Sequence, residues 1–121
     1  MTPAAKPLTR LLIIVTADPE RSGRLAEAIR LATGVSAWEK VSVTLFIGGA
    51  AVAGLLPGEG RFVDEDNIVE FLPGLVERQK EVYVEASSEL AAARRTELPF
   101  PELDPAGLAR LAAQHDYVMR F

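Results

Sequence analysis

Aliphatic runs along the chain alternate with segments in which apolar residues recur at helical spacing. The first run, TRLLIIVT at residues 9–16, holds five consecutive large aliphatic residues. Such a run is typical of a strand buried on both faces, as in a parallel sheet covered by helices. We expect further strands at residues 40–47, 81–85 and 117–121, and a brief one at 96–98. The pattern therefore predicts about five strands.

Helix-favouring segments connect these strands. Asp18 and Pro19 directly follow the first strand, and we expect Asp18 to cap a helix that begins at Pro19 and ends near Trp38. Residues 50–56 suit two helical turns before the turn sequence PGEG. The loop that follows is expected to continue through Asp66.

The second half of the chain contains one helix breaker and two helix starts. Pro73 would disrupt a helix that runs through Leu72, so we expect a short turn and then a helix that restarts at Pro73. Ser87 or Ser88 can cap the Ala-rich helix that follows the strand EVYVE. Asp104, with proline after it, begins the last helix.

This order of strands and helices predicts an α/β fold: a three-layer α/β/α sandwich with a mainly parallel sheet of about five strands. We expect residues 1–121 to form one domain, because a chain of this length suits a single core. In such sheets, ligands bind beyond the carboxyl ends of the strands. That rule predicts a ligand-binding rim formed by Thr16, Asp18, Gly48, Gly49, Glu85, Ser87 and Ser88.

The composition excludes several classes of function. The net charge of -4 arises from 17 acidic and 13 basic residues without a basic cluster, so we expect no nucleic-acid partner. No apolar run approaches the roughly 20 residues that span a bilayer, and the first residues do not resemble a secretory signal. We therefore expect a cytoplasmic protein that does not bind membranes. The chain has no cysteine, which excludes disulfides, thiolate nucleophiles and cysteine zinc sites.

Nucleophilic and acid/base chemistry at the rim have structural alternatives. A serine nucleophile at Ser87 or Ser88 needs a base, and the single histidine, His115, is expected near the amino ends of the strands, far from Ser87. Helix capping is therefore the favoured role for both serines. Asp18 and Glu85 form a carboxylate pair suited to acid/base catalysis, but a helix cap and a solvated strand end explain them more simply. We expect no catalytic residue.

Anion and metal binding receive little support from the sequence. Gly48 and Gly49 could let an anion approach backbone N–H groups at the start of a helix, but close packing or a tight turn is the favoured explanation. Asp64, Glu65 and Asp66 lack the bend and the later ligand of a calcium loop, so we interpret them as a solvated loop. The sequence predicts neither a metal nor a cofactor.

Four segments of the chain resemble the DsrE/DsrF-like family, which includes YchN-like proteins and sulfur-relay subunits. They are LLIIVTADPERSGRLAEAIRLA, KVSVTLFIGGAAV, EVYVEASSELAAARR and LAAQHDYVMRF. The resemblance implies a parallel sheet of about five strands with helices on both faces. It also implies association into dimers, trimers or hexamers.

The resemblance also identifies a missing group. Sulfur-carrying members hold a persulfide on a cysteine near the third strand-to-helix junction, where this chain has Ala86, Ser87 and Ser88. A serine hydroxyl is far less nucleophilic than a thiolate and cannot hold a transferable sulfur as a persulfide. Persulfide transfer by this chain alone is therefore not expected.

Our leading hypothesis is a non-catalytic DsrE-like homo-oligomer that binds a small molecule or a protein partner at the rim. The resemblance suggests an association with sulfur metabolism. One alternative is a small enzyme in which Asp18 or Glu85 acts as a general base. Another is an inactive subunit of a sulfur-relay hetero-oligomer whose partner supplies the cysteine.

Overall fold

The computed structural model describes residues 8–77, 81–86, 89 and 100–121. Its elements in chain order are β1 (Thr9–Val15), α1 (Arg24–Ser36), β2 (Val41–Ile47), the 3-10 helix η1 (Gly49–Leu55), α2 (Glu65–Glu77), β3 (Glu81–Glu85), β4 (Glu102–Leu103), α4 (Pro105–Ala113) and β5 (Tyr117–Arg120). The four longer predicted strands are each confirmed to within one residue. The brief strand predicted at 96–98 lies outside the described residues.

In the described chain, the strands form one five-stranded sheet in the order β4-β3-β2-β1-β5. Every neighbouring pair is parallel. The central position of β1 explains its aliphatic run, because Leu12, Ile13, Ile14 and Val15 are all buried and helices cover both faces. The predicted parallel α/β architecture is confirmed.

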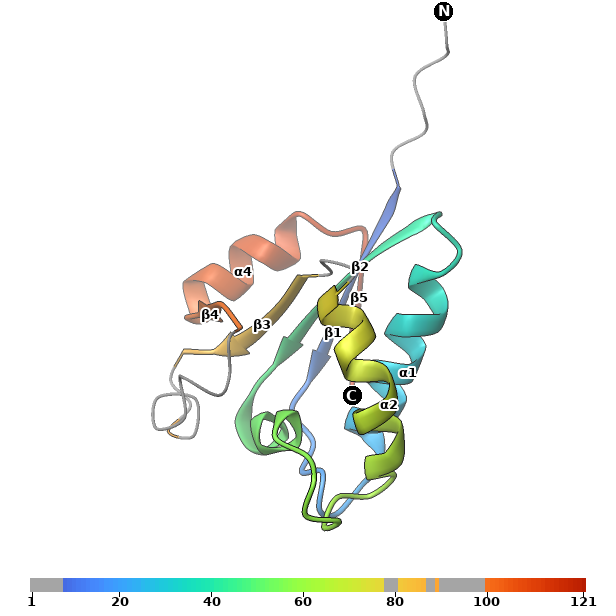
Figure 1. The fold of residues 1–121 in the computed structure, drawn as a ribbon. Coiled ribbons are helices and arrows are strands. Elements are labelled where there is room, and N and C mark those ends of the chain that lie inside the picture. Colours follow the sequence, from blue (N-terminus) through green and yellow to red (C-terminus); the bar gives the residue numbers. More distant parts are fainter. Residues whose placement is uncertain (1–7, 78–80, 87–88, 90–99) are drawn as a thin grey trace, which may run out of the picture.

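Helices lie on both faces of this sheet (Figure 1). α1 and α2 cover one face, where Ile13, Val15 and Ile29 belong to the larger hydrophobic core. α4 covers the other face, where Leu12 and Leu111 belong to a smaller core. Successive residues of β1 therefore point to opposite cores, which is the expected alternation of a strand. The three predicted layers are present.

The prediction that a helix begins at Pro19 is wrong. The carbonyl oxygen of Asp18 accepts hydrogen bonds from the backbone N–H groups of both Arg21 and Ser22, at 3.1 Å each. These bonds close a separate turn, and α1 begins only at Arg24. The capping chemistry of Asp18 was recognised correctly, but it serves the turn and not the helix.

The predicted break at Pro73 is also wrong, as is the loop predicted to continue through Asp66. α2 begins at Glu65 and continues through Pro73. A proline inside a helix costs about 3 kcal/mol. Burial of Ile68, Leu72 and Leu75 on one side of α2 offsets this cost, since each buried side chain contributes roughly 1.5 to 3 kcal/mol.

The helix start at Asp104 is confirmed. The Asp104 carboxylate accepts a hydrogen bond of 2.7 Å from the backbone N–H of Gly107, which is the N-cap geometry expected of Asp. The strand β4, immediately before this cap, was not predicted. Its backbone pairs with β3 at Val84 and Glu85, so it extends the sheet beside the predicted rim.

Candidate functional site

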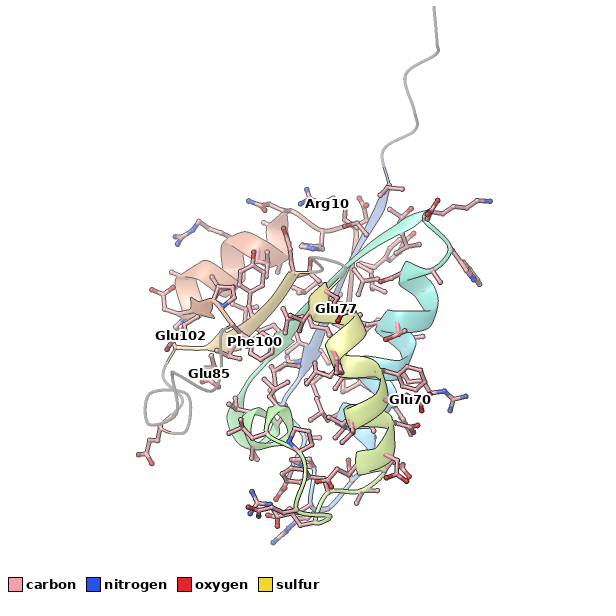
Figure 2. All side chains as sticks on the ribbon, viewed as in Figure 1. Arg10, Glu70, Glu77, Glu85, Phe100 and Glu102 are labelled. Atoms are coloured by element: carbon pink, nitrogen blue, oxygen red, sulfur yellow. The ribbon has the colours of Figure 1, made fainter. Side chains whose placement is uncertain are left out.

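The register of the sheet brings the predicted rim to one edge. Val15 lies beside Ile47, and Ile47 lies beside Val84. Because these strands are parallel, the residues that follow them emerge at the same end of the sheet. Figure 2 shows Glu85 at this end and Arg10, in the first part of β1, at the opposite end.

Glu85 and the two glycines form the best-defined contact of the rim. The Glu85 Oε2 atom accepts a hydrogen bond of 2.7 Å from the backbone N–H of Gly49. A Cβ atom on Gly48 would lie only 2.8 Å from the same oxygen, and Gly49 has a positive φ of 54°. Close packing and a turn therefore explain both glycines. The N–H of Gly49 is one of the backbone groups that could have bound an anion, and it donates to Glu85 instead.

Thr16 borders the same contact. A Cβ atom on Gly49 would lie 3.7 Å from the carbonyl oxygen of Thr16. The side chain of Thr16 is exposed. The backbone N–H of Thr16 donates to the carbonyl oxygen of Phe121 at 3.1 Å. Since β1 lies between β2 and β5, the strand order reverses here, and such reversal points are where α/β sheets bind ligands.

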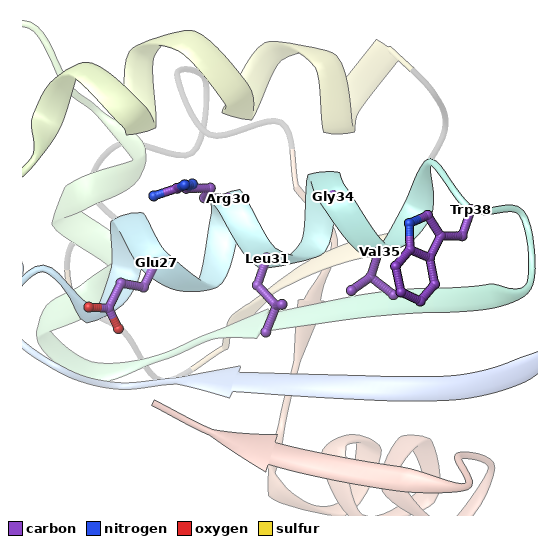
Figure 3. Close-up of a pocket in the computed structure, with 6 residues that line it drawn as sticks. All are labelled: Glu27, Arg30, Leu31, Gly34, Val35 and Trp38. Atoms are coloured by element: carbon purple, nitrogen blue, oxygen red, sulfur yellow. The ribbon is translucent and has the colours of Figure 1, made fainter.

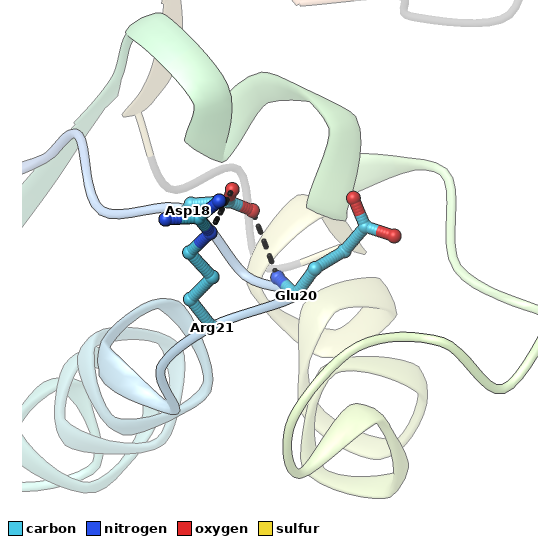
Figure 4. Close-up of polar contacts among 3 residues, drawn as sticks. All are labelled: Asp18, Glu20 and Arg21. Carbon is cyan, nitrogen blue, oxygen red and sulfur yellow. Dashed lines mark hydrogen bonds and ion pairs between the residues drawn. The ribbon is translucent and has the colours of Figure 1, made fainter.

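Asp18 is engaged within its own turn. Its Oδ1 atom accepts from the backbone N–H of Glu20 at 2.9 Å, and its Oδ2 atom lies 3.8 Å from Arg21 Nε (Figure 4). The carboxylates of Asp18 and Glu85 thus have separate partners. Ser87 and Ser88 lie outside the described residues.

Comparison with solved structures identifies the fold. A crystal structure of the YchN protein from E. coli aligns with this chain with a TM-score of 0.73 and 22% sequence identity. The alignment covers 94% of this chain and 100% of YchN. The chain has a DsrE-like fold. No protein-family model matches the sequence, and no curated protein matches it.

The DsrE-like sheet also holds a polar network that the sequence did not reveal. His115 Nδ1 lies 2.6 Å from the carbonyl oxygen of Leu111, and His115 Nε2 lies 3.0 Å from the hydroxyl of Thr44. The Thr44 hydroxyl donates to Glu81 Oε2 at 3.1 Å. Thr44 is only 2% exposed. A threonine within an alternating strand gives no signal of such a network in a single sequence.

Counting hydrogens indicates how this network is satisfied. A carbonyl oxygen can only accept, so Nδ1 of His115 donates to Leu111. The hydroxyl of Thr44 has one hydrogen, which it donates to Glu81. The contact between Nε2 of His115 and the Thr44 hydroxyl joins these two bonds into one network.

His115 lies near the amino ends of the strands, as the sequence predicted. Asp116, the next residue, bonds to β1 at Arg10: its backbone N–H donates to the Arg10 carbonyl oxygen at 2.8 Å, and its carboxylate accepts from the Arg10 N–H at 2.8 Å. Glu81, the carboxylate in the His115 network, is the first residue of β3. The network and the rim are therefore at opposite ends of β3.

The acidic segment 64–66 takes part in local structure. Glu65 and Asp66 form the start of α2, and Glu65 Oε2 accepts from the backbone N–H of Gly60 at 2.8 Å. Of the three residues predicted to lie in a solvated loop, only Asp64 lies outside α2. Among the described residues, no group of three or more histidine or acidic side chains is arranged to hold a metal ion.

A shallow groove follows one side of α1 (Figure 3). Its lining residues are Glu27, Arg30, Leu31, Gly34, Val35 and Trp38. Leu31, Val35 and Trp38 point away from α2 in this view, and Trp38 is 71% exposed.

Within the described part of the chain, no helix is long and apolar enough to cross a membrane.

Proposed function

We propose that this chain is a non-catalytic, homo-oligomeric binding protein that holds a small molecule or a protein partner at the rim. The contact between Glu85 and the backbone N–H of Gly49 carries the proposal. It fixes a carboxylate at the carboxyl end of β3, beside the exposed residues Thr16 and Gly49. A fixed polar group in such a position orients a ligand without a conformational change.

The groups at the rim favour a ligand that donates hydrogen bonds. Glu85 and Asp18 give the rim negative charge while their oxygens bond within the chain, and Thr16 contributes a hydroxyl that can accept or donate. The N–H of Gly49, which would suit an anion, is engaged by Glu85. Ammonium, guanidinium or amide groups on the partner therefore complement this surface better than carboxylate or phosphate groups.

Sulfur transfer is not part of the proposal, because the chain has no cysteine to carry a persulfide. An association with sulfur metabolism rests on the resemblance to the DsrE/DsrF-like family. A role as an inactive sulfur-relay subunit would require a partner that supplies the cysteine. Co-purification of such a partner from the native host would favour that alternative over a homo-oligomer.

Titration by NMR tests the rim directly. Ethylammonium, methylguanidinium and acetamide serve as probes with hydrogen-bond donors, and acetate serves as the anionic control. We expect the donors to shift the backbone amide signals of Thr16 and Gly49, and acetate to leave them unchanged. Shifts that avoid the rim, or equal shifts with acetate, would contradict the proposal.

Two variants make this titration specific. Glu85→Gln removes the charge that attracts cationic probes, so the shifts with ethylammonium should be lost. Glu70→Gln is the matched control, because Glu70 is exposed on α2 and lies on the other side of the molecule from Glu85 (Figure 2). Equal losses in both variants would indicate a general effect of net charge and not a rim site.

A further inference from the structure

The strand β5 ends the described sheet on one side. Tyr117 is 65% exposed, Val118 46% and Met119 39%, and Arg120 is also exposed. Proteins usually protect such edges with lysine, proline or a bulge, because an open strand edge can pair with another chain. The segment YVMR has only Arg120 as a charged residue, so we expect this apolar edge to be covered in the assembled protein.

The hydrogen bonds of β5 show which backbone groups face the open edge. Phe121, just after β5, donates its N–H to Ile14 at 2.8 Å and accepts at its carbonyl oxygen from Thr16 at 3.1 Å. Both its backbone groups therefore point to β1. Along a strand these groups alternate in direction, so those of Met119 also point to β1. The backbone groups of Val118 and Arg120 point to the open edge.

The side chains of this edge complement themselves when the strand is reversed. In an antiparallel pair centred on Val118, Val118 faces its own copy, Tyr117 faces Met119, and Asp116 faces Arg120. The pairs combine a methionine with an aromatic ring and a carboxylate with a guanidinium. Asp116 is exposed; its Oδ2 atom accepts from the Arg10 N–H of β1 at 2.8 Å, so the pairing with Arg120 of the second copy uses its other oxygen.

The neighbouring register lacks this complementarity. Centring the pair on Met119 would place Val118 opposite Arg120 and would leave Asp116 without a charged partner. The register centred on Val118 also makes Val118 a hydrogen-bonded pair, which fits the direction of its backbone groups. The register centred on Met119 would likewise allow hydrogen bonds between Val118 and Arg120 across the edge, so the charge pairing selects the arrangement centred on Val118.

We propose that β5 pairs antiparallel with β5 of a second copy of this chain, centred on Val118, so that two sheets join into one. A two-fold axis brings the same strand of both copies together. This inference rests on the homo-oligomer part of the proposed function and specifies its surface. The rim lies at the carboxyl ends of the strands and does not depend on it.

Disulfide trapping tests the register, because the chain contains no cysteine of its own. Tyr117→Cys and Met119→Cys are prepared as separate single variants, then mixed, allowed to exchange subunits and oxidised. Opposite residues at a non-hydrogen-bonded position have Cα atoms about 4.5 Å apart, within the range of about 4.4–6.8 Å that a disulfide bridges. We expect a cross-linked dimer in the mixture, up to roughly half of the protein, which is the statistical share of heterodimers.

Each variant alone is the matched control. In the proposed register each cysteine lies diagonally from its own copy, at a Cα distance of about 7–8 Å, which is beyond the reach of a disulfide. Cross-linking of either variant alone, or none in the mixture, would overturn the proposal. Sedimentation velocity of the unmodified protein separates the two ideas: self-association without cross-linking rejects only this surface, whereas a monomer rejects the homo-oligomer as well.

Charge reversal gives an independent measurement. Arg120→Glu places a carboxylate opposite Asp116 of the second copy, and we expect about tenfold weaker dimerisation, because two opposite-charge pairs are replaced by repulsion. The double variant Asp116→Arg/Arg120→Glu should recover association. Arg110→Glu, an equal charge change at an exposed position of α4, should leave it unchanged. If Arg120→Glu and Arg110→Glu change dimerisation by the same amount, the proposed pairing is wrong.

Discussion

At the scale of single residues, two polar contacts join neighbouring elements of this sheet. Glu85 accepts from the N–H of Gly49 at the rim, and Thr44 joins His115 to Glu81 near the other end of β3. Each contact depends on one polar side chain, Glu85 or Thr44, that joins parts of the chain far apart in sequence. Each is therefore sensitive to the loss of one atom.

Replacement of Thr44 by valine should break the network while preserving shape. The hydroxyl is lost from a buried position, and Nε2 of His115 then lacks a partner, so we expect the free energy of unfolding to fall by about 1–3 kcal/mol. Urea denaturation measures the loss. Thr44→Ser keeps the hydroxyl, and the ring nitrogen NMR signals of His115 should change in the valine variant only. Identical ring signals in both variants would contradict the network.

Tyr83 gives the chain a dependence on alkaline pH. Burial raises the pKa of the Tyr83 phenol above its ordinary value of 10.0, and the nearby Glu81 carboxylate raises it further. As the pH rises past 10.0, the unfolded chain therefore loses this proton before the folded chain does. The free energy of unfolding should be unaffected below this pH and should decrease above it.

Tyr83→Phe should weaken that decrease, because it removes the titrating group. Urea denaturation of both proteins below and above pH 10 measures the difference between them. If the two proteins lose stability in parallel above this pH, Tyr83 does not titrate as described.

At the scale of elements, Gly54 in η1 and Gly34 in α1 differ in how much space a side chain would have. A Cβ atom on Gly54, in η1, would overlap Leu25 Cδ2 and lie 3.4 Å from Pro19, and Leu25 is fully buried. A Cβ atom on Gly34, inside α1, would meet nothing within 4 Å. The first glycine therefore allows η1 to pack against α1, whereas the second only weakens its helix.

Alanine at each position should have opposite effects. Gly54→Ala should lower the free energy of unfolding by about 1–3 kcal/mol through overpacking. Gly34→Ala should raise it by about 0.5–1 kcal/mol, because alanine favours a helix. Thermal or urea denaturation of the pair compares them directly. A stabilising Gly54→Ala would show that η1 and α1 can move apart at little cost.

At the scale of the whole molecule, the DsrE-like fold separates two surfaces. The rim gathers residues after β1, β2 and β3, because their parallel strands end side by side. The open edge of β5 runs along one side of the same sheet. A dimer formed through β5 would thus leave the carboxyl ends of β2 and β3 available to a ligand.

The lack of a thiol predicts how the whole chain responds to a persulfide donor. We expect no gain of sulfur by mass spectrometry when the protein is incubated with a persulfide-bearing donor protein, because no residue can form the persulfide. Ala86→Cys is the control, since it places a thiol at the corner after β3 and tests whether the donor reacts. Sulfur on the unmodified chain would contradict the expectation.

Much of the fold could be predicted from the sequence, for physical reasons that act locally. The aliphatic run of β1 records burial on both faces of a sheet, and the aspartate-proline pair at the start of α4 satisfies free helix N–H groups. These signals arise from residues close together in the chain, so a single sequence contains them. The rim followed from them, because parallel strands bring their carboxyl ends to the same edge.

Tertiary structure decided whatever depends on distant residues. The sequence determined the order and type of the long elements and the absence of a thiol. Only packing decided that α2 continues through Pro73, since burial against the core outweighs the lost helical bond. Only the register of the sheet decided that Thr44 contacts His115 and that Glu85 contacts Gly49. A hydrogen bond between residues far apart in the chain produces no periodic pattern in the sequence.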